Sequence, residues 1–116
     1  MKNYLAIYLG SAAGMDRWKQ LPEAERKPLE EAGVKAWHAW VSANAASITQ
    51  MGSPLGKTKR VSKQGIADVR NDMGAWTVVQ ADSHDDAAKL FQDHPHFTIF
   101  PGDAIEVMEL LPVPGQ

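Results

Sequence analysis

A short run near the N-terminus constrains this chain most, because it predicts a strand that is apolar on both faces. Residues 3–9 are rich in strand-forming side chains and end at Gly10, a turn-forming residue. Side chains alternate along a strand, so the run divides into two apolar rows. The rows are Leu5, Ile7 and Leu9 on one face and Tyr4, Ala6 and Tyr8 on the other. Both faces of such a strand need a cover in the folded protein.

The rest of the chain predicts two main helices and further strands. A long helix is predicted from about residue 22 to about residue 46, after a short helical turn over residues 15–21. A second helix is predicted to start after Ser83, whose hydroxyl can cap it, and to end at His94, because a residue before proline avoids helical geometry. The remaining predicted strands are residues 48–51, a weak strand 57–62 that continues as 66–70 beyond a bulge or turn, 75–81 and 105–111.

Apart from the weak strand over residues 57–70, the order of these elements is β-α-β-β-α-β. It predicts an α+β fold of the ferredoxin-like kind, with both helices on one face of an antiparallel sheet. Residues 1–112 form the single predicted domain and residues 113–116 a tail. Two helices cover only one sheet face, so the apolar row on the other face predicts a homodimer through the open sheet face.

Composition argues against several classes of partner. A net charge of −2 over 116 residues lacks the basic excess of a dedicated nucleic-acid binder. No apolar run approaches the roughly 20 residues of a membrane span, and the one near the start is shorter than a signal-peptide core. The chain has no cysteine, and it contains no nucleotide-binding or zinc-protease motif. We expect a cytoplasmic protein with no nucleic-acid partner, no membrane partner, no metal and no cofactor.

The candidate catalytic residues are His94, His96 and Asp103. An extended His-Pro-His segment would place both imidazoles on one side, where Asp103 could join them in acid–base chemistry. The same three groups could also bind a divalent metal. A structural interpretation stands beside these two. In it, His94 bonds free carbonyls in the last helical turn, His96 orders the loop, and Asp103 fixes the turn after Gly102.

Aromatic side chains predict a substrate pocket between the long helix and the sheet, closed by the loop after His94. The candidate substrate-binding residues are Tyr8, Trp37, Trp40, Asn44 and Trp76. Packing in the core is the alternative for the aromatic residues, and a bond to backbone near the helix end is the alternative for Asn44. A basic stretch could steer an anionic substrate to this pocket, or could simply be a solvated strand edge. It comprises Lys57, Lys59, Arg60, Lys63 and Arg70.

Four segments resemble the YCII-related (YciI-like) family. They are residues 1–8 (MKNYLAIY), 74–83 (GAWTVVQADS), 94–97 (HPHF) and 102–108 (GDAIEVM). The resemblance implies a ferredoxin-like dimeric α+β barrel with a histidine- and aspartate-containing cleft, and one relative looks like a dehydrochlorinase of aromatic degradation. The family's Asp-Gly-Pro-Phe signature falls near residues 64–67, where only Gly65 matches. The family's histidine near the start of the first helix has no equivalent, because His38 falls mid-helix on the polar face.

The resemblance implies a protein that binds or transforms a small, anionic organic molecule in a pocket of each subunit. Proton transfer or elimination, with His94 or His96 as base, is the reaction class to expect. The alternative is a non-catalytic dimeric scaffold or ligand sensor.

Overall fold

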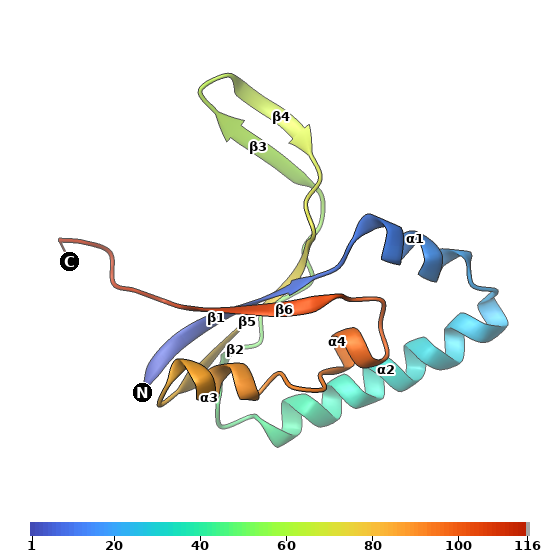
Figure 1. Cartoon of the computed structure of the whole chain (residues 1–116), viewed down its shortest axis with the longest axis horizontal. Helices are drawn as coiled ribbons and strands as arrows, with labels where there is room; N and C mark the ends of the chain where they lie inside the picture. Colours follow the sequence, from blue (N-terminus) through green and yellow to red (C-terminus); the bar gives the residue numbers. More distant parts are fainter. Residues whose placement is uncertain (116) are drawn as a thin grey trace.

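A four-stranded antiparallel sheet is the centre of the computed structural model, which describes residues 1–115 (Figure 1). The strand order is β2-β5-β1-β6, so the first strand lies in the middle, between β5 and β6. These strands are β1 (Lys2–Leu9), β2 (Ile48–Gln50), β5 (Met73–Ala81) and β6 (Ala104–Glu109). This order confirms the predicted ferredoxin-like α+β class.

The helices leave one sheet face open, as Figure 1 shows. They are α1 (Ala12–Gln20), α2 (Glu23–Ala43), α3 (His84–Lys89) and α4 (Pro95–Thr98). The core lies between α2, α3 and the sheet, and it contains one of the two rows of β1. Its buried members are Tyr4, Ala6, Tyr8, Val79, Ala81, Ala87 and Phe91. No helix within residues 1–115 is long and apolar enough to cross a membrane.

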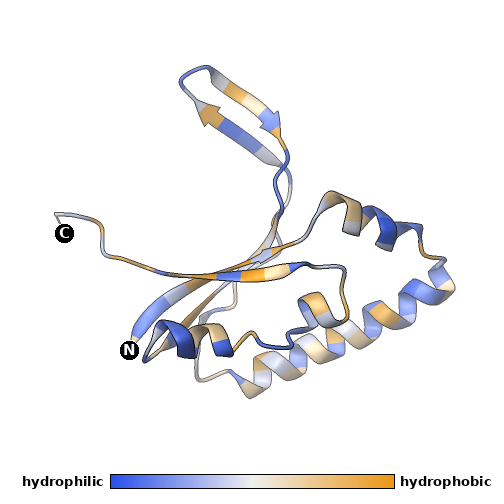
Figure 2. Cartoon of the chain, viewed as in Figure 1, coloured by the Kyte–Doolittle hydropathy of each residue, from blue (hydrophilic) through white to orange (hydrophobic). Residues whose placement is uncertain are grey.

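The open face of the sheet carries the other row of β1. Leu5 and Ile7 are half-buried there, and Met108 beside Leu5 is 42% exposed. Ile7 pairs with Trp76 on one side and with Glu106 on the other, so a carboxylate lies beside the apolar side chains of this face. Figure 2 shows hydrophobic residues along these strands.

A two-stranded hairpin stands away from the sheet, on the side opposite the helices (Figure 1). It consists of β3 (Thr58–Ser62) and β4 (Gly65–Val69), paired antiparallel with Ser62 opposite Gly65. The turn at residues 63–64 and the positive φ of Gly65 (108°) reverse the chain, so β4 returns beside β3. We call residues 57–70 the arm.

The segment around His94 differs from the prediction. Ser83 caps α3 as expected, with Oγ accepting from the backbone N–H of Asp86 at 3.0 Å. The helix, however, ends at Lys89, and His94 is the N-cap of a new short helix whose first residue is Pro95. Proline fits there because the first N–H of a helix has no internal partner. The expectation that His94 ends the second helix and bonds its last carbonyls is therefore wrong.

Smaller differences concern element ends. The long helix stops at Ala43 instead of residue 46, because Asn44 adopts a non-helical conformation as the C-cap. The last strand runs over Ala104–Glu109 instead of 105–111.

Candidate functional site

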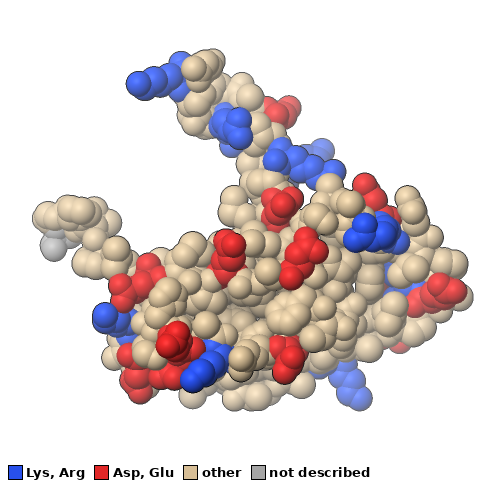
Figure 3. Space-filling view, in the orientation of Figure 1, with Lys and Arg blue, Asp and Glu red and all other residues tan. Residues whose placement is uncertain are grey.

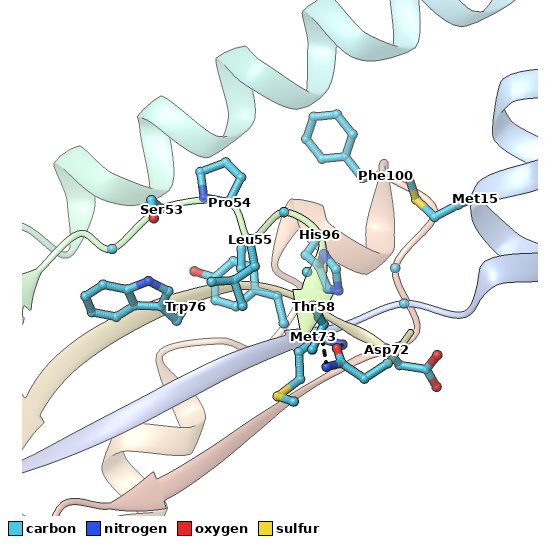
Figure 4. Close-up of a pocket in the computed structure, with 18 of the residues that line it drawn as sticks. Met15, Ser53, Pro54, Leu55, Thr58, Asp72, Met73, Trp76, His96 and Phe100 are labelled. Carbon is cyan, nitrogen blue, oxygen red and sulfur yellow. Dashed lines mark hydrogen bonds between the residues drawn. The ribbon is translucent and has the colours of Figure 1, made fainter. Parts of the chain in front are cut away.

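An open cleft of about 1540 Å³ lies between α1, α2, the loop after α4 and the chain that leads from β2 into the arm. Its walls are largely apolar, and Figure 4 shows Met15 and Phe100 on one side and Leu55 and Pro54 on another. Phe100 can lie against α2 because Gly33 has no side chain: a Cβ there would be 2.3 Å from the ring. Trp18 packs beside Phe100, with ring centroids 6.0 Å apart.

His94 is a buried lining residue of the cleft, with only 1% of its surface exposed. Its Nδ1 accepts from the backbone N–H of His96 at 3.0 Å. Because Nδ1 is the acceptor, the neutral ring carries its proton on Nε2. Nε2 has no hydrogen-bond partner within residues 1–115. Burial, and secondarily the neighbouring His96, lowers the pKa of His94 to about 4, so the ring is a neutral donor near pH 7.

His96 has the complementary arrangement. Its Nε2 lies 2.7 Å from the carbonyl oxygen of Leu9. A carbonyl can only accept, so Nε2 carries a proton, and in the neutral ring Nδ1 holds the lone pair. The ring fits because residue 102 is glycine: a Cβ there would be 2.2 Å from Nε2. His96 lines the same cleft as His94.

The structure therefore brings the two predicted histidines together, although by a different local geometry. Both rings pack on Tyr8, with centroid distances of 5.1 Å for His94 and 5.3 Å for His96. The N-cap of α4 produces this arrangement, because His94 precedes the helix and His96 lies in its first turn. Trp40 packs on His94 from another direction, with centroids 4.7 Å apart.

Asp103 faces elsewhere. Its Oδ2 accepts from the backbone N–H of Ser11 at 2.8 Å, and the residue lines a separate, smaller hollow beside α1. Its own N–H donates to the carbonyl of Leu9, the group that also accepts from His96. Asp103 thus holds the turn between β1 and α1. Across the described residues, no three histidine or carboxylate side chains come together as metal ligands.

The predicted substrate-binding residues separate into two groups. Tyr8, Trp37 and Trp76 line the cleft, whereas Trp40 and Asn44 are not among its lining residues. Trp40 donates from Nε1 to the carbonyl of Leu90 at 2.8 Å and packs on the core. Asn44 donates from Nδ2 to the carbonyl of Trp40 at 2.9 Å, which is the backbone bond that the sequence offered as its alternative.

Thr77 is a lining residue that sequence reasoning missed. Its Oγ1 donates to the carbonyl of Met51 at 3.0 Å, so the hydroxyl of Tyr8, also 3.0 Å away, donates to Thr77. The oxygen of Tyr8 keeps free acceptor capacity, and burial raises the pKa of this phenol. A threonine on the core-facing side of an apolar strand was the signal that could have identified it.

Charged side chains gather where the arm joins the cleft. Four basic and two acidic residues line the cleft, five of them in or next to the arm and one, Lys19, on α1, so the charged lining has a net positive charge. They are Lys19, Lys57, Lys59 and Arg70, with Asp68 and Asp72. The arrangement favours an anionic ligand with an apolar body.

Comparison with known proteins bears on the fold. The sequence matches no protein-family model and no curated protein. A solved structure matches with a TM-score of 0.56 over 94% of this chain and 93% of the other, at 14% sequence identity. It is 5-chloro-2-hydroxyhydroquinone dehydrochlorinase from Burkholderia phenoliruptrix AC1100, in complex with 2,5-dihydroxybenzoquinone. The chain has the fold of the dimeric α+β barrel proteins. At 14% identity, this likeness is one of fold alone.

Proposed function

We propose that this chain is a YCII-like protein that binds a small organic anion in the cleft and acts on it by histidine-assisted proton transfer. One observation carries the proposal: two imidazoles that both pack on Tyr8 and line the same cleft have opposite nitrogens available. Nε2–H of His94 is an unpartnered donor, and Nδ1 of His96 is a free acceptor. Removal of a proton next to a carbonyl or phenol requires a base to take the proton and a hydrogen-bond donor to stabilise the negative charge that forms on the oxygen.

In the proposed reaction, His96 Nδ1 takes a proton from the ligand. The negative charge that develops on a ligand oxygen is stabilised by the Nε2–H of His94. If the ligand carries a leaving group on the adjacent carbon, the electron pair of the broken C–H bond forms a double bond and the group departs as an anion. No oxidant or reductant is needed. The structural neighbour is a dehydrochlorinase with a bound dihydroxybenzoquinone. It supports, as the first case to test, an elimination from the keto tautomer of a chlorinated hydroquinone, in which the carbon that loses chloride is tetrahedral.

The proposal includes a homodimer through the open sheet face. Leu5, Ile7 and Met108 form a partly exposed apolar surface there, and the described helices all lie elsewhere. A second copy would cover this surface by sheet-on-sheet packing. Light scattering on the purified protein tests the dimer, and a monomeric mass at micromolar concentration would contradict it.

A non-catalytic ligand sensor is the second candidate. The observation that favours it is the burial of His94, whose Nδ1 already has a capping role at the start of α4. A sensor would use the Nε2–H donor for recognition and would not need the lone pair of His96. The two functions therefore differ in their dependence on His96.

Two substitutions separate them. His94→Asn keeps an acceptor in place of Nδ1 and removes the Nε2–H donor. His96→Gln keeps a donor to the Leu9 carbonyl and removes the Nδ1 base. Binding of 2,5-dihydroxybenzoquinone and related aromatic anions is followed by tryptophan fluorescence, and turnover by chloride release from a chlorinated hydroquinone.

If the protein is an enzyme, His94→Asn should weaken ligand binding about tenfold or more. His96→Gln should bind the ligand normally and lose at least about a hundredfold in turnover. If the protein is a sensor, His94→Asn should show the same loss of ligand binding, and the wild type should show no turnover. If the wild type binds no member of the panel, or if both variants behave as the wild type, the proposal fails.

A further inference from the structure

The arm lacks support from its own chain. A two-stranded hairpin is at best marginally stable alone in water. The arm leaves the sheet on its open side and extends beyond the body of the molecule (Figure 1). Val61 and Ile66 form a cross-strand pair on one of its faces, and they are 77% and 72% exposed. An exposed apolar pair at the end of a projecting hairpin indicates a contact surface.

The charge of the arm is opposite to that of the rest of the chain. Residues 57–70 contain five basic residues and one acidic residue, for a net charge of +4. The remaining residues contain seven basic and thirteen acidic, for a net charge of −6. Figure 3 shows basic side chains on the arm and acidic side chains on the body surface below it. The ion pair of the arm, Lys59 with Asp68, is internal to the arm.

Glu106 places a carboxylate on the open sheet face, where a positively charged side chain of a partner could pair with it. It lies on β6 opposite Ile7, two residues from Met108, and it forms no ion pair with any residue in 1–115. Covering this face with a second sheet would remove the carboxylate from water. A buried carboxylate without a cationic partner costs several kcal/mol, so the covering surface has to bring a positive charge.

We propose that the arm of each copy in the homodimer docks on the open face of the second copy. Val61 and Ile66 pack at the β6 edge of this face, against Met108 and beside the contact between the two sheets, and Lys63 at the arm's turn pairs with Glu106. The inference rests on the proposed dimer and adds the segment that completes its interface. The occupant is a second copy because the arm rises on the very side where the dimer would form, and its charge is complementary to that of the body. Two-fold symmetry makes the contact twice in each dimer.

The first test is the dimer dissociation constant, measured by sedimentation over a concentration series. Val61→Thr/Ile66→Thr keeps strand propensity and removes the apolar pair, and we expect the dissociation constant to rise about tenfold or more. Leu29→Gln is the matched control, because Leu29 is 40% exposed on α2, away from the open face. It should dimerise as the wild type does. Circular dichroism confirms that each variant is folded.

The second test is a charge exchange. Lys63→Glu and Glu106→Lys should each weaken the dimer, and the double variant should dimerise more tightly than either single variant. Lack of this recovery would overturn the Lys63–Glu106 pair, and a dimer unaffected by Val61→Thr/Ile66→Thr would overturn docking of the arm. A monomeric wild type would instead contradict the dimer itself. If the wild type is such a monomer and its arm variants lose binding to a polyanion such as heparin, the arm binds a different partner.

Discussion

The backbone N–H of His96 donates to Nδ1 of His94 at 3.0 Å, and this one hydrogen bond determines which nitrogen of His94 carries the proton. The bond arises because His94 is the N-cap of α4, a position that normally uses an oxygen acceptor. As a result, the neutral imidazole of His94, with its proton on Nε2, is packed among the aromatic rings of Tyr8, Trp40 and Phe91. The chemistry proposed for the cleft depends on this relationship.

The burial of His94 predicts a specific pH dependence of stability. The pKa of His94 is about 4 in the folded protein, against an ordinary value of 6.5, so the unfolded chain binds the proton more readily. The free energy of unfolding should therefore be unaffected by this group above about pH 6.5 and fall as the pH drops from there to about 4. The loss is roughly 3 kcal/mol, because each pKa unit corresponds to about 1.4 kcal/mol.

Urea denaturation over this pH range measures the effect. His94→Asn is the control, since it keeps a capping acceptor and does not titrate, and the difference between the two proteins isolates His94 from the carboxylates. Parallel pH profiles for the two proteins would contradict the prediction.

Gly102→Ala should displace the ring of His96. The new Cβ would lie 2.2 Å from Nε2, so the bond to the Leu9 carbonyl would break. We expect a loss of about 1–3 kcal/mol in the free energy of unfolding, together with a changed imidazole nitrogen shift in the NMR spectrum. Gly56→Ala is the control, because a Cβ there meets nothing within 4 Å. Equal stability of the two variants would argue against the packing of His96 on residue 102.

Two hydrogen bonds connect the Tyr8 hydroxyl to Thr77 and Thr77 to the Met51 carbonyl, and they should contribute unequally to stability. Tyr8→Phe removes the outer donor and leaves Thr77 bonded to the Met51 carbonyl, so it should cost about 1 kcal/mol. Thr77→Val leaves both the Tyr8 hydroxyl and the Met51 carbonyl unpaired, so it should cost about 2–3 kcal/mol. The double variant should cost less than the sum, as chemical denaturation can show. Additive losses would mean that the two hydroxyls act independently.

Asp103→Asn should leave ligand binding and turnover unchanged. The amide oxygen can still accept from the N–H of Ser11, which is the contact that the carboxylate makes. Asp103→Ala should lower stability by about 0.5–1.5 kcal/mol, because the turn before α1 loses this bond. A large loss of turnover in Asp103→Asn, at unchanged stability, would restore the acid–base role that the sequence suggested.

Local patterns were sufficient for much of the fold. The strand-forming residues of 3–9 and 75–81 predicted two central strands, and Ser83 predicted the start of α3. They were insufficient around Pro95, because the restraint that proline places on the preceding residue fits the end of one helix as well as the start of the next. Packing decided between them: α3 ends early, and Asp93, with a φ of 57°, turns the chain into α4.

By itself, the sequence determined the order of the elements, the apolar rows of β1 and the proximity of His94 to His96, since these depend on side-chain period and short spacing. The tertiary structure alone decided what those histidines can do. The tautomer of His96 depends on the carbonyl of Leu9, which is 87 residues away, and Asp103 leaves the pair for the N–H of Ser11, 92 residues away. The partners are backbone groups, which every residue carries, so no residue pattern marks them, and only the folded sheet brings them within bonding distance.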